Sequence, residues 1–241
     1  MRYNFLQFIL MKNNCMSLTH SLTCKTCALK DLCHDLELDT QEKKQFSDVL
    51  SSTKVIQKGE ALYQENEKTN ALYAIRNGSV KITNQNGKIL QFFLAGDFLG
   101  LDAFNDQHHK VNAIAIEQTT VCAYDLSSMM SLLSKVPKFN HYFLKTLSHQ
   151  LNQQYNSFNH HLNAKQRLCS LINKISDHYS LRGFSATEFT LSMKRQDIAN
   201  YLDLAAETIS RTIHQLEDEH ILTLNNKTIN ILNLSKLKEM C

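Results

Sequence analysis

The sequence predicts an α+β protein in which an N-terminal double-stranded β-helix, or jelly roll, is followed by one long helix and a C-terminal winged helix-turn-helix. Three observations predict this fold class. Residues 52–126 hold short apolar runs separated by glycine-bearing turns, and residues 138–163 contain neither glycine nor proline. Residues 195–219 have the spacing of two short helices joined by a tight turn.

Four turn signals indicate the jelly roll, because an Asn-Gly pair between short alternating runs is the strongest local sign of a hairpin. They are Lys58-Gly59, Asn77-Gly78, Asn86-Gly87 and Ala95-Gly96-Asp97. Turns at this spacing are typical of β-sandwiches and jelly rolls. The segment "VNAIAIEQTTVCAYDL" supplies the last strands and places Cys122 on one of them. Ahead of the strands, residues 36–50 predict a short helix with Thr40 as its N-cap.

A long helix is predicted to start at Pro137, since proline is favoured in the first helical turn. It has about 26 residues, or ~39 Å at ~1.5 Å per residue. Such a helix either forms part of a core or pairs with a copy of itself. Glutamine, asparagine and histidine alternate with its apolar residues too densely for full burial, which favours a homodimer seam. The seam residues are expected to be Phe143, Leu147, Leu151, Gln154, Tyr155 and Phe158.

Composition narrows the function classes. The chain has 241 residues and a formal net charge of +3, which permits nucleic-acid binding without requiring it. Seven cysteines, an odd number, argue against a secreted disulfide framework. No apolar run approaches the ~20 residues of a membrane span, and the N-terminus lacks a signal-peptide cleavage pattern. We therefore expect a cytoplasmic protein without a membrane partner. The common phosphate-loop, hydrolase and metalloprotease motifs are absent, so we do not expect an enzyme.

The segment "RQDIANYLDLAAETISRTIHQLEDE" predicts a helix-turn-helix. Its two helices bury opposing apolar sides, made of Ile198, Tyr201 and Leu202 on the first and Ile209, Ile213 and Leu216 on the second. A plain helical hairpin would show the same pattern, but the turn at Asn225-Asn226 adds a hairpin that fits a wing. The outward residues suit base edges and phosphates in a major groove. They are Glu207, Thr208, Ser210, Arg211 and His214, joined by Arg195 from the first helix.

The chain resembles the CRP/FNR family of bacterial transcription regulators over roughly residues 20–235. The resemblance is carried by "LYAIRNGSVKI", "FLAGDFLG", "IANYLDLAAETISR" and "LNNKTINIL". It implies a homodimer that binds a palindromic operator in double-stranded DNA. The run "ETISR" is more similar to the FNR branch, and this similarity implies that Glu207, Ser210 and Arg211 read a half-site like TTGAT.

The resemblance also implies a division of the chain into four parts. These are a cysteine-bearing leader at 1–35, a cyclic-nucleotide-binding-like β-roll sensor at 36–136, a dimerisation helix at 137–163 and a DNA-binding domain at 164–241. Relatives that bind cyclic AMP hold its phosphate with an Arg-Ser pair, where this sequence has Val111-Asn112. We therefore expect no cyclic nucleotide here, because a buried phosphate needs a fixed cation.

Cys24, Cys27 and Cys33 have the spacing C-x2-C-x5-C, which brings three thiolates within reach of one metal ion or cluster. A fourth ligand must come from elsewhere in the chain. The residues alone leave open an iron–sulfur cluster, a structural zinc ion and a redox-active disulfide. The resemblance to the FNR branch implies a [4Fe–4S] cluster on Cys24, Cys27, Cys33 and Cys122.

The implied function is an oxygen-responsive regulator whose intact cluster favours dimerisation and DNA binding. The alternative is a regulator of the same family that responds to heme, thiol redox state or a small molecule. RNA polymerase is an expected partner, with contacts implied at residues 182–186 and 84–88. The implied seam holds no acidic residue between 138 and 163, so repulsion between unliganded subunits should be low.

Overall fold

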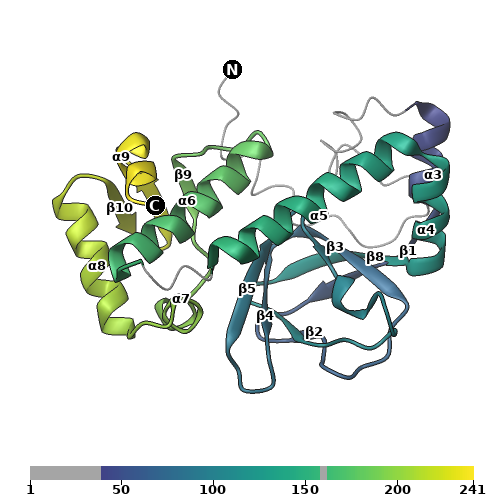
Figure 1. Ribbon diagram of the computed structural model, residues 1–241, viewed down its shortest axis with the longest axis horizontal. Helices are drawn as coiled ribbons and strands as arrows, with labels where there is room; N and C mark the ends of the chain where they lie inside the picture. Colours follow the sequence, from purple (N-terminus) through teal and green to yellow (C-terminus); the bar gives the residue numbers. More distant parts are fainter. Residues whose placement is uncertain (1–38, 158–161) are drawn as a thin grey trace.

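A computed structural model describes residues 39–157 and 162–241. Three of the four expected cluster ligands, in the leader, and the expected seam residue Phe158 lie outside these residues. Figure 1 shows the roll and the C-terminal domain connected by the long helix α5 (Pro137–Ser157).

Two four-stranded antiparallel sheets form the roll. One has the strand order β1-β8-β3-β6, from β1 (Leu50–Ile56), β8 (Thr119–Asp125), β3 (Ala71–Asn77) and β6 (Phe98–Leu99). The other has the order β2-β7-β4-β5, from β2 (Ala61–Tyr63), β7 (Asn112–Ala115), β4 (Ser79–Thr83) and β5 (Ile89–Leu94). Alternate residues of the strands face inward, and Ile75, Val80 and Val121 are completely buried between the sheets. The predicted jelly roll and its four turns are confirmed.

The outer face of the β1-β8-β3-β6 sheet packs against α4 (Leu126–Lys135) and α5. Phe98 lies edge-on to Phe143 at a ring distance of 5.6 Å, and Phe139 stacks beside Phe143 at 6.4 Å. Phe143 is only 4% exposed, so it packs in the core of its own subunit rather than in an open seam. The prediction for this residue is therefore corrected, because the roll buries one face of the helix before any partner can.

The helix boundaries differ from the prediction at three points. Helix α3 (Thr40–Asp48) is capped by Asp39 rather than Thr40, since Asp39 and Glu42 exchange backbone and side-chain hydrogen bonds of 2.8 Å. Helix α4 was not expected, although the Asp125 carboxylate caps it by accepting from the Ser128 N–H. The long helix does not run to 163, because Asn163 already caps the next helix.

The C-terminal domain consists of α6 (Ala164–Leu181), a helix pair and a small sheet. The sheet has the order β10-β11-β9, from β9 (Glu188–Thr190), β10 (Leu222–Asn225) and β11 (Thr228–Ile231). Helix α9 (Leu234–Glu239) closes the domain against α6. The predicted terminal hairpin is confirmed, with Asn226 at a φ of 57° in its turn. In the part of the chain that the structure describes, no helix is both long and apolar enough to span a membrane.

Candidate nucleic-acid interface and metal-ligating cysteine

The helix pair consists of α7 (Arg195–Leu202) and α8 (Ala206–Asp218), as the sequence predicts. The turn between them depends on Asp203, which adopts the left-handed conformation at a φ of 54°. The Leu204 N–H then donates to the Ala199 carbonyl, and Ala199 is small enough for the two helices to cross closely. Ile198 and Ile209 are buried in the contact, so the geometry of a helix-turn-helix is present.

The residues expected to contact DNA lie on the opposite side of α8. Glu207, Arg211 and His214 are exposed, and Thr208 and Ser210 are half-exposed. Arg195, at the start of α7, is exposed beside them. An open cleft of about 470 Å³ separates the N-terminal ends of the two helices. It is lined by Lys194, Arg195, Gln196, Ala206, Glu207 and Ser210. The structure therefore brings the candidate residues onto one accessible surface.

In the described part of the chain, the N-terminal end of α8 lacks a capping side chain, and Glu207 lies in its first turn. Its N-cap residue is Ala205, whose side chain offers no acceptor to the first N–H groups of the helix. Such groups point out of the helix end and attract phosphate oxygens together with the helix dipole. Lys194 and Arg195 add positive charge at the same cleft. Lys194 and Gln196 were not predicted, because a polar segment before a helix has no distinctive periodicity.

His214 is held in place by the wing. Its Nδ1 lies 3.1 Å from Glu217 Oε2, and Glu217 Oε1 accepts a 3.0 Å hydrogen bond from the Leu224 N–H on β10. Glu217 therefore links the outer surface of α8 to the first strand of the wing. Lys227, exposed in the wing turn, presents a further cation that sequence reasoning did not single out.

The inner side of α8 is expected to control the stability of the whole domain. Leu216 is completely buried, and truncation to alanine removes its packing and leaves a cavity. We expect Leu216→Ala to lower the free energy of unfolding by roughly 2–5 kcal/mol. Gln215→Ala, at the adjacent exposed position, should change it by less than about 0.5 kcal/mol. Urea denaturation of the two variants measures both values, and equal effects would contradict this packing.

Cys122 lies in the middle of β8, paired with Thr53 on β1 and Ala74 on β3. Its side chain belongs to the cluster of residues on the outer face of this sheet, which also includes Val49 at the end of α3. Val49 connects α3 to β1, so the described chain enters the roll beside the face that carries the Cys122 side chain. This placement fits a ligand set shared between the leader and β8.

The surroundings of Cys122 also differ from those of the other buried cysteine. Burial raises the pKa of the Cys122 thiol, but the Thr53 hydroxyl, the Arg76 charge and the Tyr124 hydroxyl oppose this shift and favour its thiolate. Burial, together with the neighbouring Cys241, raises the pKa of Cys169 to about 12. Metal ligation requires the thiolate, so Cys122 fits a ligand better than Cys169 does. Within the described ranges, no group of three or more potential metal ligands gathers at one point.

The exposed side of α5 carries leucines at seven-residue spacing. Leu144 is 58% exposed and Leu151 is 53% exposed, whereas Leu147 packs partly against the roll. Gln150 also faces its own roll and donates to the Phe98 carbonyl at 3.3 Å. Leu144 was not among the predicted seam residues, and the structure adds it to Leu151 as a candidate contact. The backbone of Gln154 and Tyr155 is helical.

The loop around Lys110 to Asn112 makes its polar contacts within the protein. The Asn112 side chain accepts from a backbone N–H within the roll. The Lys110 ammonium forms an ion pair with Asp106. His109 is completely buried, and its ring stacks on Tyr63 with centroids 3.5 Å apart. The Nδ1 atom of His109 lies 3.3 Å from the Asp102 carboxylate, and its buried Nε2 has no hydrogen-bond partner among the described residues.

Comparison with known proteins gives two family matches and several close relatives. A cyclic nucleotide-binding domain family matches residues 53–136, and a Crp-like helix-turn-helix domain family matches residues 166–240. The chain is 35% identical over 226 residues to the fumarate and nitrate reduction regulatory protein of Vibrio cholerae, covering 91% of this chain and 90% of the relative. It is 34% identical to the anaerobic regulatory protein of Haemophilus influenzae, covering 91% and 88%. The structure of FixK2 from Bradyrhizobium japonicum matches with a TM-score of 0.68 at 24% identity, covering 78% of this chain and 96% of that one.

Proposed function

Because this chain belongs to the CRP/FNR family of DNA-binding transcription regulators, we propose that it is an oxygen-responsive member in which a [4Fe–4S] cluster controls dimerisation and operator binding. The observation that carries the proposal is Cys122, whose side chain packs in the same cluster as Val49, the residue between α3 and β1. Cys24, Cys27 and Cys33 precede α3 in the sequence. One relative is named for fumarate and nitrate reduction and the other for anaerobic regulation, and both names support the same function.

The DNA contacts follow from the surface of α8. Arg211 supplies a planar pair of donors that matches the two acceptors of guanine, and Glu207 accepts from the cytosine amino group. Ser210 lies between them along the helix, and its small side chain permits a close approach of α8 to the bases. Arg195, Lys194 and the N–H groups of the first turn of α8 hold phosphates. A dimer places two such helices about one DNA turn apart, ~34 Å, and so reads a palindrome with TTGAT-like half-sites.

The four cysteine thiolates would hold the cluster, which supplies sensitivity to oxygen when bound. The residues of the chain transmit its presence. Ligation ties the leader to β8, and the outer face of this sheet packs directly on α4 and α5. Tying the leader to β8 therefore stabilises the sheet face on which α5 packs. The exposed side of α5 presents Leu144 and Leu151 to a partner subunit. This is a two-state coupling between cluster binding and dimerisation.

The exposed leucines of α5 are expected to hold the dimer together. Leu151→Asp places a charge in the centre of an apolar contact, so we expect the dimer dissociation constant to rise at least about 100-fold, equivalent to ~2.7 kcal/mol. Asn152→Asp adds the same charge at a neighbouring exposed position, which makes it the matched control. Sedimentation equilibrium measures both constants, and a dimeric Leu151→Asp variant would contradict this seam.

The absence of acidic residues between 138 and 163 sets the behaviour of the cluster-free protein. Like charges across a helix pair oppose association, and this chain lacks them. We therefore expect the apoprotein to be partly dimeric at micromolar concentration. Its dimeric fraction should exceed that of a variant in which Leu144 and Leu151 are both replaced by aspartate. Apoprotein that sediments only as monomer at that concentration would refute this expectation.

RNA polymerase is the proposed protein partner at the promoter. Leu181 and Phe184, at the end of α6, are 68% and 58% exposed and form an apolar surface within or beside the implied segment 182–186. Arg182 itself is bonded to Asp97 of the roll. In the implied segment 84–88, Lys88 is bonded to Asp203. We therefore assign the polymerase contact to the Leu181–Phe184 surface first.

Fluorescence anisotropy tests the DNA-binding part of the proposal. Anaerobically purified protein should bind a duplex with two TTGAT half-sites at least about 1,000-fold more tightly than a scrambled duplex at ~150 mM salt. Equal affinities for the two duplexes would refute sequence-specific regulation.

A further inference from the structure

The β4–β5 hairpin of the roll contacts the first helix of the helix-turn-helix. Lys88 forms an ion pair with Asp203 at 2.6 Å and also donates to the Asn200 carbonyl. The Asn200 side chain bonds the hairpin twice, since it accepts from the Ile89 N–H at 2.7 Å and donates to the Gly87 carbonyl at 3.2 Å. These residues are more than 100 positions apart in sequence, so the contact joins two domains.

Two further polar contacts lie along the same interface. Lys81 on β4 forms a 2.7 Å ion pair with Asp197 on α7, and both side chains are less than a quarter exposed. Glu117 accepts from the Ser192 hydroxyl at 2.7 Å. Partly buried ion pairs are screened less by salt than exposed ones. The Lys81–Asp197 pair holds the first turn of α7 against the roll.

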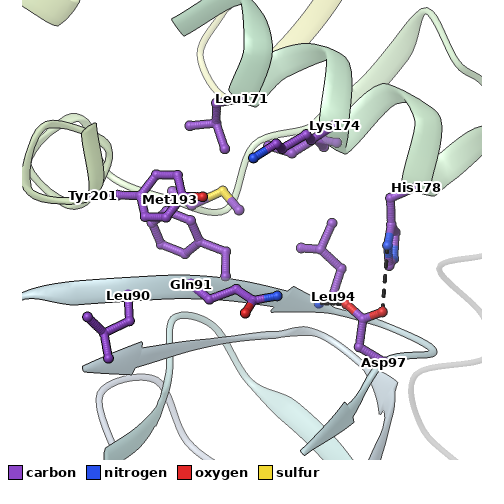
Figure 2. Close-up of a pocket in the computed structure, with 11 residues that line it drawn as sticks. Leu90, Gln91, Leu94, Asp97, Leu171, Lys174, His178, Met193 and Tyr201 are labelled. Carbon is purple, nitrogen blue, oxygen red and sulfur yellow. Dashed lines mark hydrogen bonds and ion pairs between the residues drawn. The ribbon is translucent and has the colours of Figure 1, made fainter. Parts of the chain in front are cut away.

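A second polar cluster joins the turn after β5 to the end of α6. Asp97 accepts a 3.2 Å hydrogen bond from Arg182, and the His178 Nε2 lies 3.2 Å from the Ala95 carbonyl. The His178 Nδ1 lies 3.0 Å from the Arg182 guanidinium and 3.8 Å from the Asp97 carboxylate, as the dashed line to Asp97 in Figure 2 shows. Gly96 allows this approach, because a Cβ at its φ of +94° would collide with the Arg182 guanidinium.

Between the two polar contacts the interface is apolar and incompletely filled. Figure 2 shows Leu94 of β5 pointing toward the helices, with Leu171 of α6 and Tyr201 of α7 on the other side of a small cavity that Gln91 and Lys174 also line. Its volume is about 40 Å³. An apolar contact with a void loses part of its packing energy, so the polar contacts at both ends contribute a larger share of the docking.

The docked arrangement leaves the DNA-binding surface free. The hairpin holds Asn200 and Asp203 at the C-terminal end of α7, whereas Arg195 and the cleft lie at its N-terminal end. Arg211 on α8 is exposed as well. Docking therefore restricts the orientation of the recognition helix relative to α5 without covering any residue proposed to touch DNA.

We propose that the β4–β5 hairpin and the Gly96–Asp97 turn form an intramolecular docking surface that holds the helix-turn-helix in its DNA-competent orientation. This inference rests on the proposed DNA-binding function and adds a residue set that controls affinity without contacting DNA. A domain released from this surface samples many orientations, and the apparent affinity falls in proportion to the fraction that remains competent.

The first test removes the hairpin contact with the double variant Lys88→Ala/Asn200→Ala in the anaerobically purified full chain. We expect its dissociation constant for the palindromic duplex to rise about tenfold, as it does when the competent fraction falls to about one tenth. Gln85→Ala is the matched control, because Gln85 lies in the same hairpin turn but bonds Glu65 within the roll. Its affinity should stay within twofold of the wild type. Sedimentation confirms that all proteins compared are dimers.

The second test disrupts the other contact without changing a charge. Gly96→Ala displaces the Arg182 side chain from Asp97 and should also raise the dissociation constant several-fold. Gly59→Ala is its control, because Gly59 has a φ of +85° with nothing within 4 Å of the added Cβ. Both variants carry similar backbone strain, so a difference between them isolates the contact with Arg182.

Backbone ¹⁵N relaxation of the DNA-free protein measures docking independently. The two domains should tumble with one correlation time in the wild type and with two in the double variant. Variants whose domains tumble separately but bind DNA as the wild type does, or bind it more tightly, would overturn the inference. A wild-type protein with one correlation time that binds palindromic and scrambled duplexes equally would instead refute the proposed function.

Discussion

Replacing Arg211 by alanine is expected to cause the largest loss of operator affinity of any single change on α8. A bidentate contact to guanine contributes about 1–3 kcal/mol, and the dimer makes two, so the loss is roughly 2–6 kcal/mol. The exposed position of Arg211 means that the change should not affect folding. Anisotropy titrations with the palindrome and with duplexes changed at the guanine positions measure both affinity and specificity.

Lys194→Ala provides the comparison for Arg211→Ala. A cation that contacts phosphate contributes to binding at every sequence, so its removal should weaken all duplexes alike and lower the salt slope by about one per subunit. If Arg211→Ala also weakened all duplexes equally, Arg211 would be a phosphate contact and the assigned reading of the half-site would be wrong.

Replacing Cys122 by alanine is expected to abolish cluster binding. The iron content of anaerobically purified protein should fall from about four atoms per chain to near zero, because three thiolates leave one iron without its ligand. The affinity for the operator should fall as well, since the protein loses the cluster that is proposed to stabilise its dimer. Iron and sulfide assays with an anaerobic anisotropy titration measure the two effects together.

Cys169→Ala is the matched control for Cys122→Ala. Cys169 is completely buried in the core of the C-terminal domain, so we expect it to be a packing residue rather than a ligand. We expect full iron content at a cost in stability of about 1 kcal/mol. A Cys122→Ala protein that kept the iron content of Cys169→Ala would contradict the ligand assignment.

Local patterns were sufficient to predict most of the fold. The strands were predictable because glycine-bearing turns fix where each begins and ends, and the helix-turn-helix was predictable because its buried residues recur with helical spacing. Helix α4 was missed although Asp125, Met129 and Leu132 provide a cap and an apolar side. Pro137 marks the end of α4, but no glycine or proline separates its start from β8.

Sequence periodicity could not divide the apolar side of α5 between its own roll and a partner. Phe143 and Leu151 belong to the same predicted stripe, but Phe143 is buried in the subunit and Leu151 is exposed. The contacts of Asn200 and Lys88 were equally beyond prediction, because they depend on how two domains approach each other. The outward residues of α8 were predictable, since they are the positions left over once its buried side is assigned.

Control of DNA affinity by a [4Fe–4S] cluster can be tested on one anaerobic sample, whose UV-visible spectrum and operator affinity are recorded before and after exposure to air. We expect a broad shoulder near ~400 nm that bleaches in air while the affinity falls in parallel. A sharp heme band, or a colourless protein that binds the operator equally well in air, would contradict it.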